Sequence, residues 1–114
     1  MKVPKWNRHM KNTDRERAWN VMRIHKGSFT RKDVARLSES SLANASKYMN
    51  TLLKAGYLMI VGFRSLAPKP GKEALYRLLK NTGPRPPIQK DLGSLYDPNT
   101  KSYWAEDLEK RLAD

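Results

Sequence analysis

The sequence predicts a mainly α-helical domain with a small β-hairpin, followed by an extended tail. Three segments between residues 13 and 55 have apolar residues at helical spacing, and each is preceded by a Ser or Thr suited to a helix N-cap. A run of β-branched and aromatic residues begins near residue 57. With 114 residues, the chain can bury one modest core.

The first helix is expected over 14–25. Thr13 and Glu16 have the spacing of a capping box, in which each side chain satisfies a free amide of the other residue. Apolar residues then recur at helical spacing up to His25. We interpret His25 as a helix C-terminal cap rather than a metal ligand, and Gly27 as the stop that follows.

The second helix is short and ends near Ser38. Thr30 and Asp33 repeat the capping-box spacing, and Phe29 and Val34 stand where a hydrophobic staple would place them. This pattern predicts both the start of the helix and the direction from which the chain enters it.

The third helix is expected over 42–55, after a polar break that ends at Ser41, a plausible N-cap. Gly56 stands where a left-handed residue terminates a helix. Helical spacing predicts an inward stripe of Leu42, Ala45, Met49, Leu52 and Leu53.

A hairpin is expected next, with strands over 57–64 and 74–79. The segment between them contains two prolines, a glycine and two lysines, which are typical of a long turn. The second strand has an alternative, because its leucines also suit a short helix.

Two extensions flank this domain, which we place at 13–81. Residues 1–12 are basic and aperiodic and are interpreted as a flexible arm. Residues 82–114 begin as a Pro-rich extended tail, include an Asp-Pro-Asn turn signal at 97–99, and are expected to end in an amphipathic helix over 103–113. The apolar stripe of that helix would contain Trp104, Leu108 and Leu112.

The excess positive charge is concentrated in residues 1–81, which comprise the arm and the domain. The protein has 23 Lys+Arg and 11 Asp+Glu, a formal net charge of +12. Residues 1–81 hold 18 of the bases and 5 of the acids, whereas residues 82–114 hold 5 bases and 6 acids. A field of this sign attracts polyanions and favours phosphate contacts. The charge therefore points to a nucleic acid partner, although a solvated basic surface is the alternative.

The segment Asn44 to Leu58 carries a family resemblance. It has a small polar residue, a core aliphatic, Ser and Lys, then core leucines and Lys54-Ala55-Gly56 before an apolar pair. This resembles the recognition helix and first wing strand of bacterial winged helix-turn-helix regulators, and Phe29 to Leu42 resembles the helix and turn before it. The resemblance covers roughly 13–80 and departs in the turn, which has no glycine. It implies double-stranded DNA binding and transcription regulation, in a bacterium or its phage.

The outward face of the third helix holds the candidate base-reading residues. Such a helix fits the major groove, where Lys can donate to guanine and Asn can pair bidentately with adenine. The bases at the start of the second helix and beside the hairpin tip are candidates for backbone or minor-groove contacts. The candidate DNA-binding residues are Ser41, Ala43, Asn44, Lys47, Tyr48, Asn50, Arg31, Lys32, Arg64, Lys69 and Lys72.

Catalysis, cofactors and metals find no support in the sequence, so we expect neither an enzyme nor a cofactor. There is no cysteine, the two histidines have no spaced acidic partner, and no Gly-rich phosphate loop is present. No apolar stretch approaches the ~20 residues that span a bilayer. We expect a cytoplasmic, nucleoid-associated protein without a membrane partner.

Two alternatives stay open on function and assembly. The same scaffold can serve as a protein-interaction or nucleoprotein-assembly module with only non-specific DNA binding; single-strand or RNA binding is a weaker option. Winged helices often bind DNA as two-fold dimers, and the 103–113 helix or the N-terminal arm would mediate such pairing. The alternative is that this helix folds back on its own domain.

Overall fold

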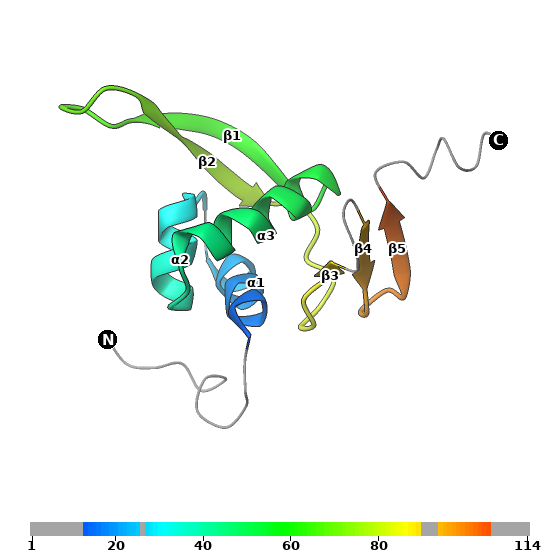
Figure 1. Ribbon diagram of the computed structural model, residues 1–114. Helices are drawn as coiled ribbons and strands as arrows, with labels where there is room; N and C mark the ends of the chain where they lie inside the picture. Colours follow the sequence, from blue (N-terminus) through cyan, green and yellow to red (C-terminus); the bar gives the residue numbers. More distant parts are fainter. Residues whose placement is uncertain (1–12, 26, 90–93, 106–114) are drawn as a thin grey trace.

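Three helices and an antiparallel hairpin form the body of the computed structural model, which describes residues 13–25, 27–89 and 94–105. The coarse prediction of three helices followed by a hairpin is confirmed, and the second hairpin segment is a strand (Figure 1). The elements of this part are α1 (Asp14–Ile24), α2 (Arg31–Ser38), α3 (Leu42–Lys54), β1 (Leu58–Ser65) and β2 (Lys72–Leu78).

Each helix begins at the residue that the capping pattern predicts. The Thr13 hydroxyl accepts from the Glu16 amide, and the Ser41 hydroxyl accepts from the Asn44 amide. Thr30 and Asp33 form a complete capping box. The backbone amide of Thr30 stabilises the ionised carboxylate, and together with other hydrogen bonds it holds the pKa of Asp33 below its ordinary value of 3.8. Local chemistry thus fixes all three helix starts.

The turn between α2 and α3 is tight although it contains no glycine. Glu39 adopts the left-handed conformation, with φ 56° and ψ 39°, that a glycine usually supplies. The Ser40 amide donates to the Ala35 carbonyl, and the Arg17 side chain donates to the Ser38 carbonyl at 2.7 Å. The geometry of the turn is therefore maintained by a hydrogen bond to α2 and by one from α1.

The core lies where the three helices meet the base of the hairpin. Trp19, Val34, Met49 and Leu52 are fully buried there. The predicted inward stripe of α3 is right except at its first residue, because Leu42 is 46% exposed. Leu42 stands in the first helical turn, where it lines a groove between α3 and β2.

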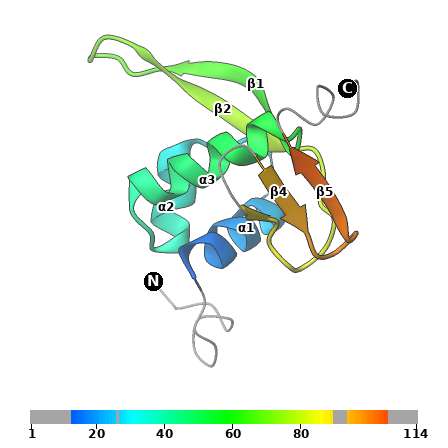
Figure 2. The same ribbon diagram turned by 45° about the vertical axis from the view of Figure 1, so that its right-hand side comes forward.

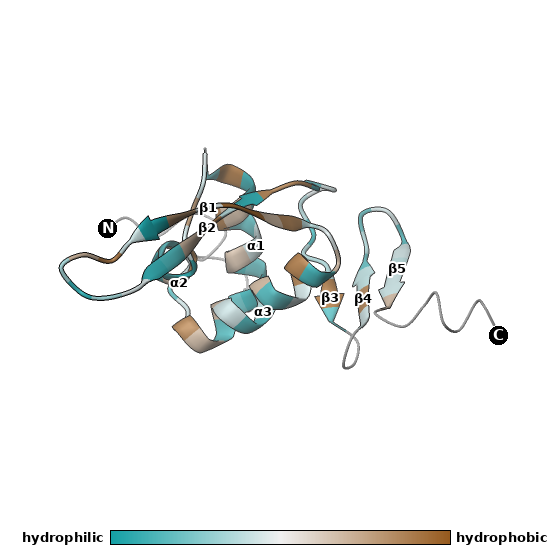
Figure 3. Ribbon diagram, turned by 90° about the horizontal axis from the view of Figure 1, so that it is seen from above, coloured by the Kyte–Doolittle hydropathy of each residue, from teal (hydrophilic) through white to brown (hydrophobic). Residues whose placement is uncertain are grey.

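The hairpin extends away from the helices, and its long first strand is apolar (Figures 1 and 3). An irregularity at Val61 shifts the register between Ile60 and Gly62, so that one strand has an extra residue. The exposed apolar side chains of β1 are Met59, Ile60, Val61 and Phe63.

The tail forms a second antiparallel sheet of β3 (Ile88–Gln89), β4 (Ser94–Asp97) and β5 (Ser102–Ala105), in the order β3-β4-β5. Figures 1 and 2 show this sheet at the end of the molecule opposite the hairpin tip. The turn signal at 97–99 is confirmed, since it leads from β4 to β5.

The expected helix over 103–113 is wrong at its first residues, because 103–105 belong to β5. Residues 106–114 and the arm over 1–12 lie outside the described residues. Trp104 packs against the protein's own core, which Leu95 joins at 1% exposure. Pairing with Tyr96 and Leu95 keeps this segment extended. The described part of the tail is therefore an integral layer of the fold.

Candidate nucleic-acid interface

The outer side of α3 is a solvent-exposed face without acidic residues. Ala43, Lys47 and Asn50 are exposed along it, while the opposite side of the helix is buried. No Asp or Glu occurs between Glu39 and Glu73, so α3 and β1 contribute no negative charge. The outer face of α3 is therefore polar and receives no negative charge from its own helix.

The hairpin borders this face on one side and β3 borders it on the other. A groove of about 160 Å³ separates α3 from β2 and is lined mainly by Leu42, Ala74 and Tyr76, with Arg31 and Lys32 at α2. On the other side, the Thr51 hydroxyl lies 3.3 Å from the Gln89 side-chain oxygen of β3. The helix is therefore flanked by β structure on both sides, which sequence reasoning predicted for the hairpin alone.

A shallow hollow of about 250 Å³ opens beside α3, between the start of α1 and β3. Lys47 and Arg15 both line it, together with Asp14, Asn44 and Gln89. The Arg15 Nε atom is buried and has no hydrogen-bond partner within the described part of the chain. Two cationic side chains thus share one concave surface at the edge of the exposed face.

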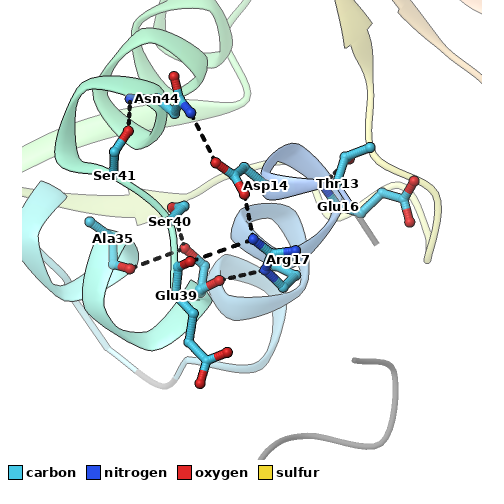
Figure 4. A network of polar contacts seen from close by, with 10 residues as sticks. Thr13, Asp14, Glu16, Arg17, Ala35, Glu39, Ser40, Ser41 and Asn44 are labelled. Atoms are coloured by element: carbon cyan, nitrogen blue, oxygen red, sulfur yellow. Dashed lines mark hydrogen bonds and ion pairs between the residues drawn. The ribbon is translucent and has the colours of Figure 1, made fainter. Parts of the chain in front are cut away.

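Asn44 is exposed but is held by an acidic partner, as Figure 4 shows. Its Nδ2 donates to Asp14 Oδ2 at 2.9 Å, and the same carboxylate forms an ion pair with Arg17. The Arg17 guanidinium also donates to the Ser38 carbonyl, so the network joins α1, the turn and α3. Asn44 is left with its side-chain oxygen as the atom that faces no internal donor in this network.

The expected DNA contact by Arg31 is corrected, because its guanidinium already donates to acceptors within the protein. It donates to the Tyr76 hydroxyl at 2.8 Å, the Ser46 carbonyl at 3.1 Å and the Asn50 Oδ1 atom at 2.5 Å. The guanidinium carbon also lies 5.2 Å from the centre of the Tyr76 ring. Arg31 therefore positions α3 against the hairpin and engages the side-chain oxygen of Asn50.

Tyr48 is a second correction, since it faces the interior rather than the groove-facing side. Its side chain is 6% exposed, and its hydroxyl donates to the Pro87 carbonyl at 2.9 Å. Burial also raises the pKa of Tyr48 well above its ordinary value. The sequence position of Tyr48 at the edge of the outward face gave no signal of the distant proline segment that covers it.

Among the candidate DNA-binding residues of the hairpin, Arg64 has an acidic partner within the protein. Arg64 forms an ion pair with Glu73 on the neighbouring strand, with its Nε donating at 2.8 Å. Lys69 and Lys72 are exposed at the tip, and Lys32 is exposed at the start of α2. The three lysines, unlike Arg64, have no resolved ion pair among the described residues.

Within residues 13–25, 27–89 and 94–105, no helix is long and apolar enough to cross a bilayer. In the same ranges, no three acidic or histidine side chains gather as a metal site. Comparisons of the chain with protein-family models, with curated proteins and with solved structures find no match. Function must therefore be argued from the geometry and charge of this interface.

Proposed function

We propose that this chain is a winged helix-turn-helix protein that binds double-stranded DNA, with α3 in the major groove and the β1–β2 hairpin as the wing. The observation that carries the proposal is the uncovered outer face of α3 around Lys47, to which α3 itself contributes no acidic residue. A regulator of transcription that recognises a particular sequence is the corresponding biological role.

The surrounding charges support this orientation. Lys32 lies at the start of α2, on one side of α3, and Lys69 and Lys72 lie at the hairpin tip. Phosphate contacts by such lysines position a protein on the duplex, whereas side chains on the inserted helix select the sequence. Ser41, at the helix start, is exposed and places free backbone amides of α3 near the same surface.

The test is selection of bound duplexes from a random pool, followed by fluorescence anisotropy on the selected and a scrambled duplex at two salt concentrations. Lys47→Ala should reduce the preference for the selected duplex by about 1–3 kcal/mol. Arg85→Ala is the matched control, because this exposed cation lies in the segment before β3. Equal affinity of the unchanged protein for selected and scrambled duplexes would contradict sequence-specific binding.

A second candidate function is supported by the apolar surface of β1. Met59, Ile60, Val61 and Phe63 are 39–64% exposed, an arrangement more typical of a protein-contacting surface than of a phosphate-contacting one. In this alternative, the protein is an interaction or nucleoprotein-assembly module that binds DNA without sequence preference. The same experiment separates the two functions, since Lys47→Ala would then weaken binding to all duplexes equally.

A further inference from the structure

The first turn of α3 presents exposed apolar side chains where a DNA-reading helix meets base edges. Leu42 is 46% exposed and Ala43 is exposed beside it. Leu42 also lines the groove between α3 and β2, together with Ala74 and Tyr76. An aliphatic side chain left in water at this place gains free energy by covering an apolar group of a partner.

The polar side chains of the same face are partly engaged inside the protein. Asn44 donates to Asp14, and Asn50 accepts from Arg31. Bidentate pairing of Asn with adenine needs both the oxygen and the amino group of one amide, in one orientation. Internal hydrogen bonds fix the orientation of both amides in the free protein. The side chains of Leu42 and Ala43, in contrast, can make only apolar contacts.

The major groove displays one apolar group, the C5-methyl of thymine. We propose that Leu42 and Ala43 recognise thymine methyl groups, so that the binding site of this protein contains A·T pairs where the start of α3 enters the groove. The inference rests on the proposed duplex binding and adds the base chemistry that α3 selects.

Nearby charges are compatible with this placement. Lys32 lines the same groove as Leu42, and the first turn of α3 itself contains no acid. The Asp14 carboxylate, which accepts from Asn44 in that turn, is paired with Arg17. Glu73 also lines the groove, but its carboxylate is paired with Arg64. A duplex whose bases contact Leu42 would therefore meet a cation at Lys32 and a neutralised ion pair at the hairpin.

The experiment replaces thymine by deoxyuracil in the selected duplex, which removes the methyl and leaves every base-pairing and groove hydrogen-bonding atom unchanged. Anisotropy titrations of the full chain should give about fourfold weaker binding per contacted methyl, the effect of one buried methylene-sized group. The loss should be the same at low and high salt, because no phosphate contact is removed.

Leu42→Ala tests the residue. This variant should bind the thymine duplex as weakly as the unchanged protein binds the deoxyuracil duplex, and should discriminate less between the two. Ile24→Ala, at a side chain 70% exposed at the end of α1, is the matched control and should retain full discrimination.

The outcomes separate this inference from the proposal beneath it. Equal affinity for thymine and deoxyuracil duplexes, with duplex binding intact, overturns the methyl recognition alone. An equal loss for Leu42→Ala on both duplexes also overturns it, and points to Leu42 packing within the protein or docking a protein segment. Absence of binding to any duplex overturns both statements.

Discussion

The hydroxyl of Tyr57 donates a 2.8 Å hydrogen bond to the carboxylate of Asp97, although 40 positions separate the two residues. Asp97 is 1% exposed and also accepts from the Thr82 hydroxyl at 2.6 Å and the Asn99 amide at 2.9 Å. One buried carboxylate therefore joins the base of the hairpin, the proline-containing segment and the second sheet. Removing this carboxylate should lower the stability of the whole domain.

Asp97→Asn should lower the free energy of unfolding by about 2 kcal/mol, because hydrogen bonds to a charged acceptor are replaced by weaker ones. Burial alone raises the pKa of Asp97, but the donors from Thr82, Tyr57 and Asn99 outweigh burial and hold it below 3.8. A lowered folded-state pKa means that this stabilisation is complete above the ordinary pKa and is lost as the pH falls through the folded value.

Urea unfolding of both proteins between pH 7 and pH 2 checks this prediction. The stability gap between the unchanged protein and Asp97→Asn should be widest near neutral pH and should close in acid. A gap that stays constant over this pH range would assign the effect to packing rather than to the charge.

Arg31→Ala should destabilise the fold by about 1–3 kcal/mol, since it removes the donor of three hydrogen bonds and leaves the Ser46 carbonyl without this partner. Lys32→Ala, at the adjacent exposed position, should change stability by less than about 0.5 kcal/mol while weakening duplex binding. Chemical denaturation and anisotropy, measured on both variants, distinguish a positioning side chain from a phosphate contact. Equal stability of the two variants would refute the positioning role.

Removing Lys69 and Lys72 together should weaken binding to selected and scrambled duplexes by the same factor. Each phosphate contact contributes about 0.9 to the slope of log affinity against log salt, so the slope should become shallower by about 2. Arg64→Ala serves as the comparison and should change the slope less, because Glu73 already neutralises that charge. A change confined to the selected duplex would assign the tip to base recognition instead.

Glu39→Gly should stabilise the turn between α2 and α3 relative to Glu39→Ala by about 1 kcal/mol. Both substitutions remove the carboxylate, but only glycine, which lacks a Cβ atom, adopts the left-handed conformation at φ 56° without steric cost. Thermal or urea unfolding of the pair measures the difference. If alanine proved as stable as glycine, the chain would have to relax out of this conformation at little cost.

The helices and the hairpin were predictable because their signals are local. Thr13, Thr30 and Ser41 each bond to an amide three residues ahead, which is a relationship visible in the sequence itself. The left-handed residue Gly56, with φ 84°, likewise ends α3 where expected. Caps, periodicity and turn residues were therefore sufficient to place these elements within one or two residues.

The second sheet was not predictable by the same means. Its strands have two to four residues, too few for a periodic pattern, and Leu95 belongs to a core cluster whose other buried members all lie earlier in the chain. Trp104 was assigned to a helical stripe whose other members lie outside the described residues. Pairing with β4 keeps the Trp104 segment extended, and no local sequence pattern indicates that pairing.

The sequence predicted which side of α3 is exposed, but it did not predict which candidate residues have partners inside the protein. Ser41, Ala43, Asn44, Lys47 and Asn50 lie exposed as expected, because a single helical period assigns them to the outer side of α3. Arg31 and Tyr48 have internal partners on other elements, and neither partner could be deduced from spacing. A basic or aromatic residue at the edge of a helix face has the same sequence signal whether it contacts a ligand or the protein itself.

The extra residue at Val61 has a consequence for the whole distal half of the β1–β2 hairpin. Side chains alternate between the two faces of a strand, so a single inserted residue inverts the phase of everything beyond it. With the insertion, Phe63 stands opposite Ala74 and Arg64 stands opposite Glu73. An in-frame loss of this one codon would exchange the sheet faces on which these two side chains lie.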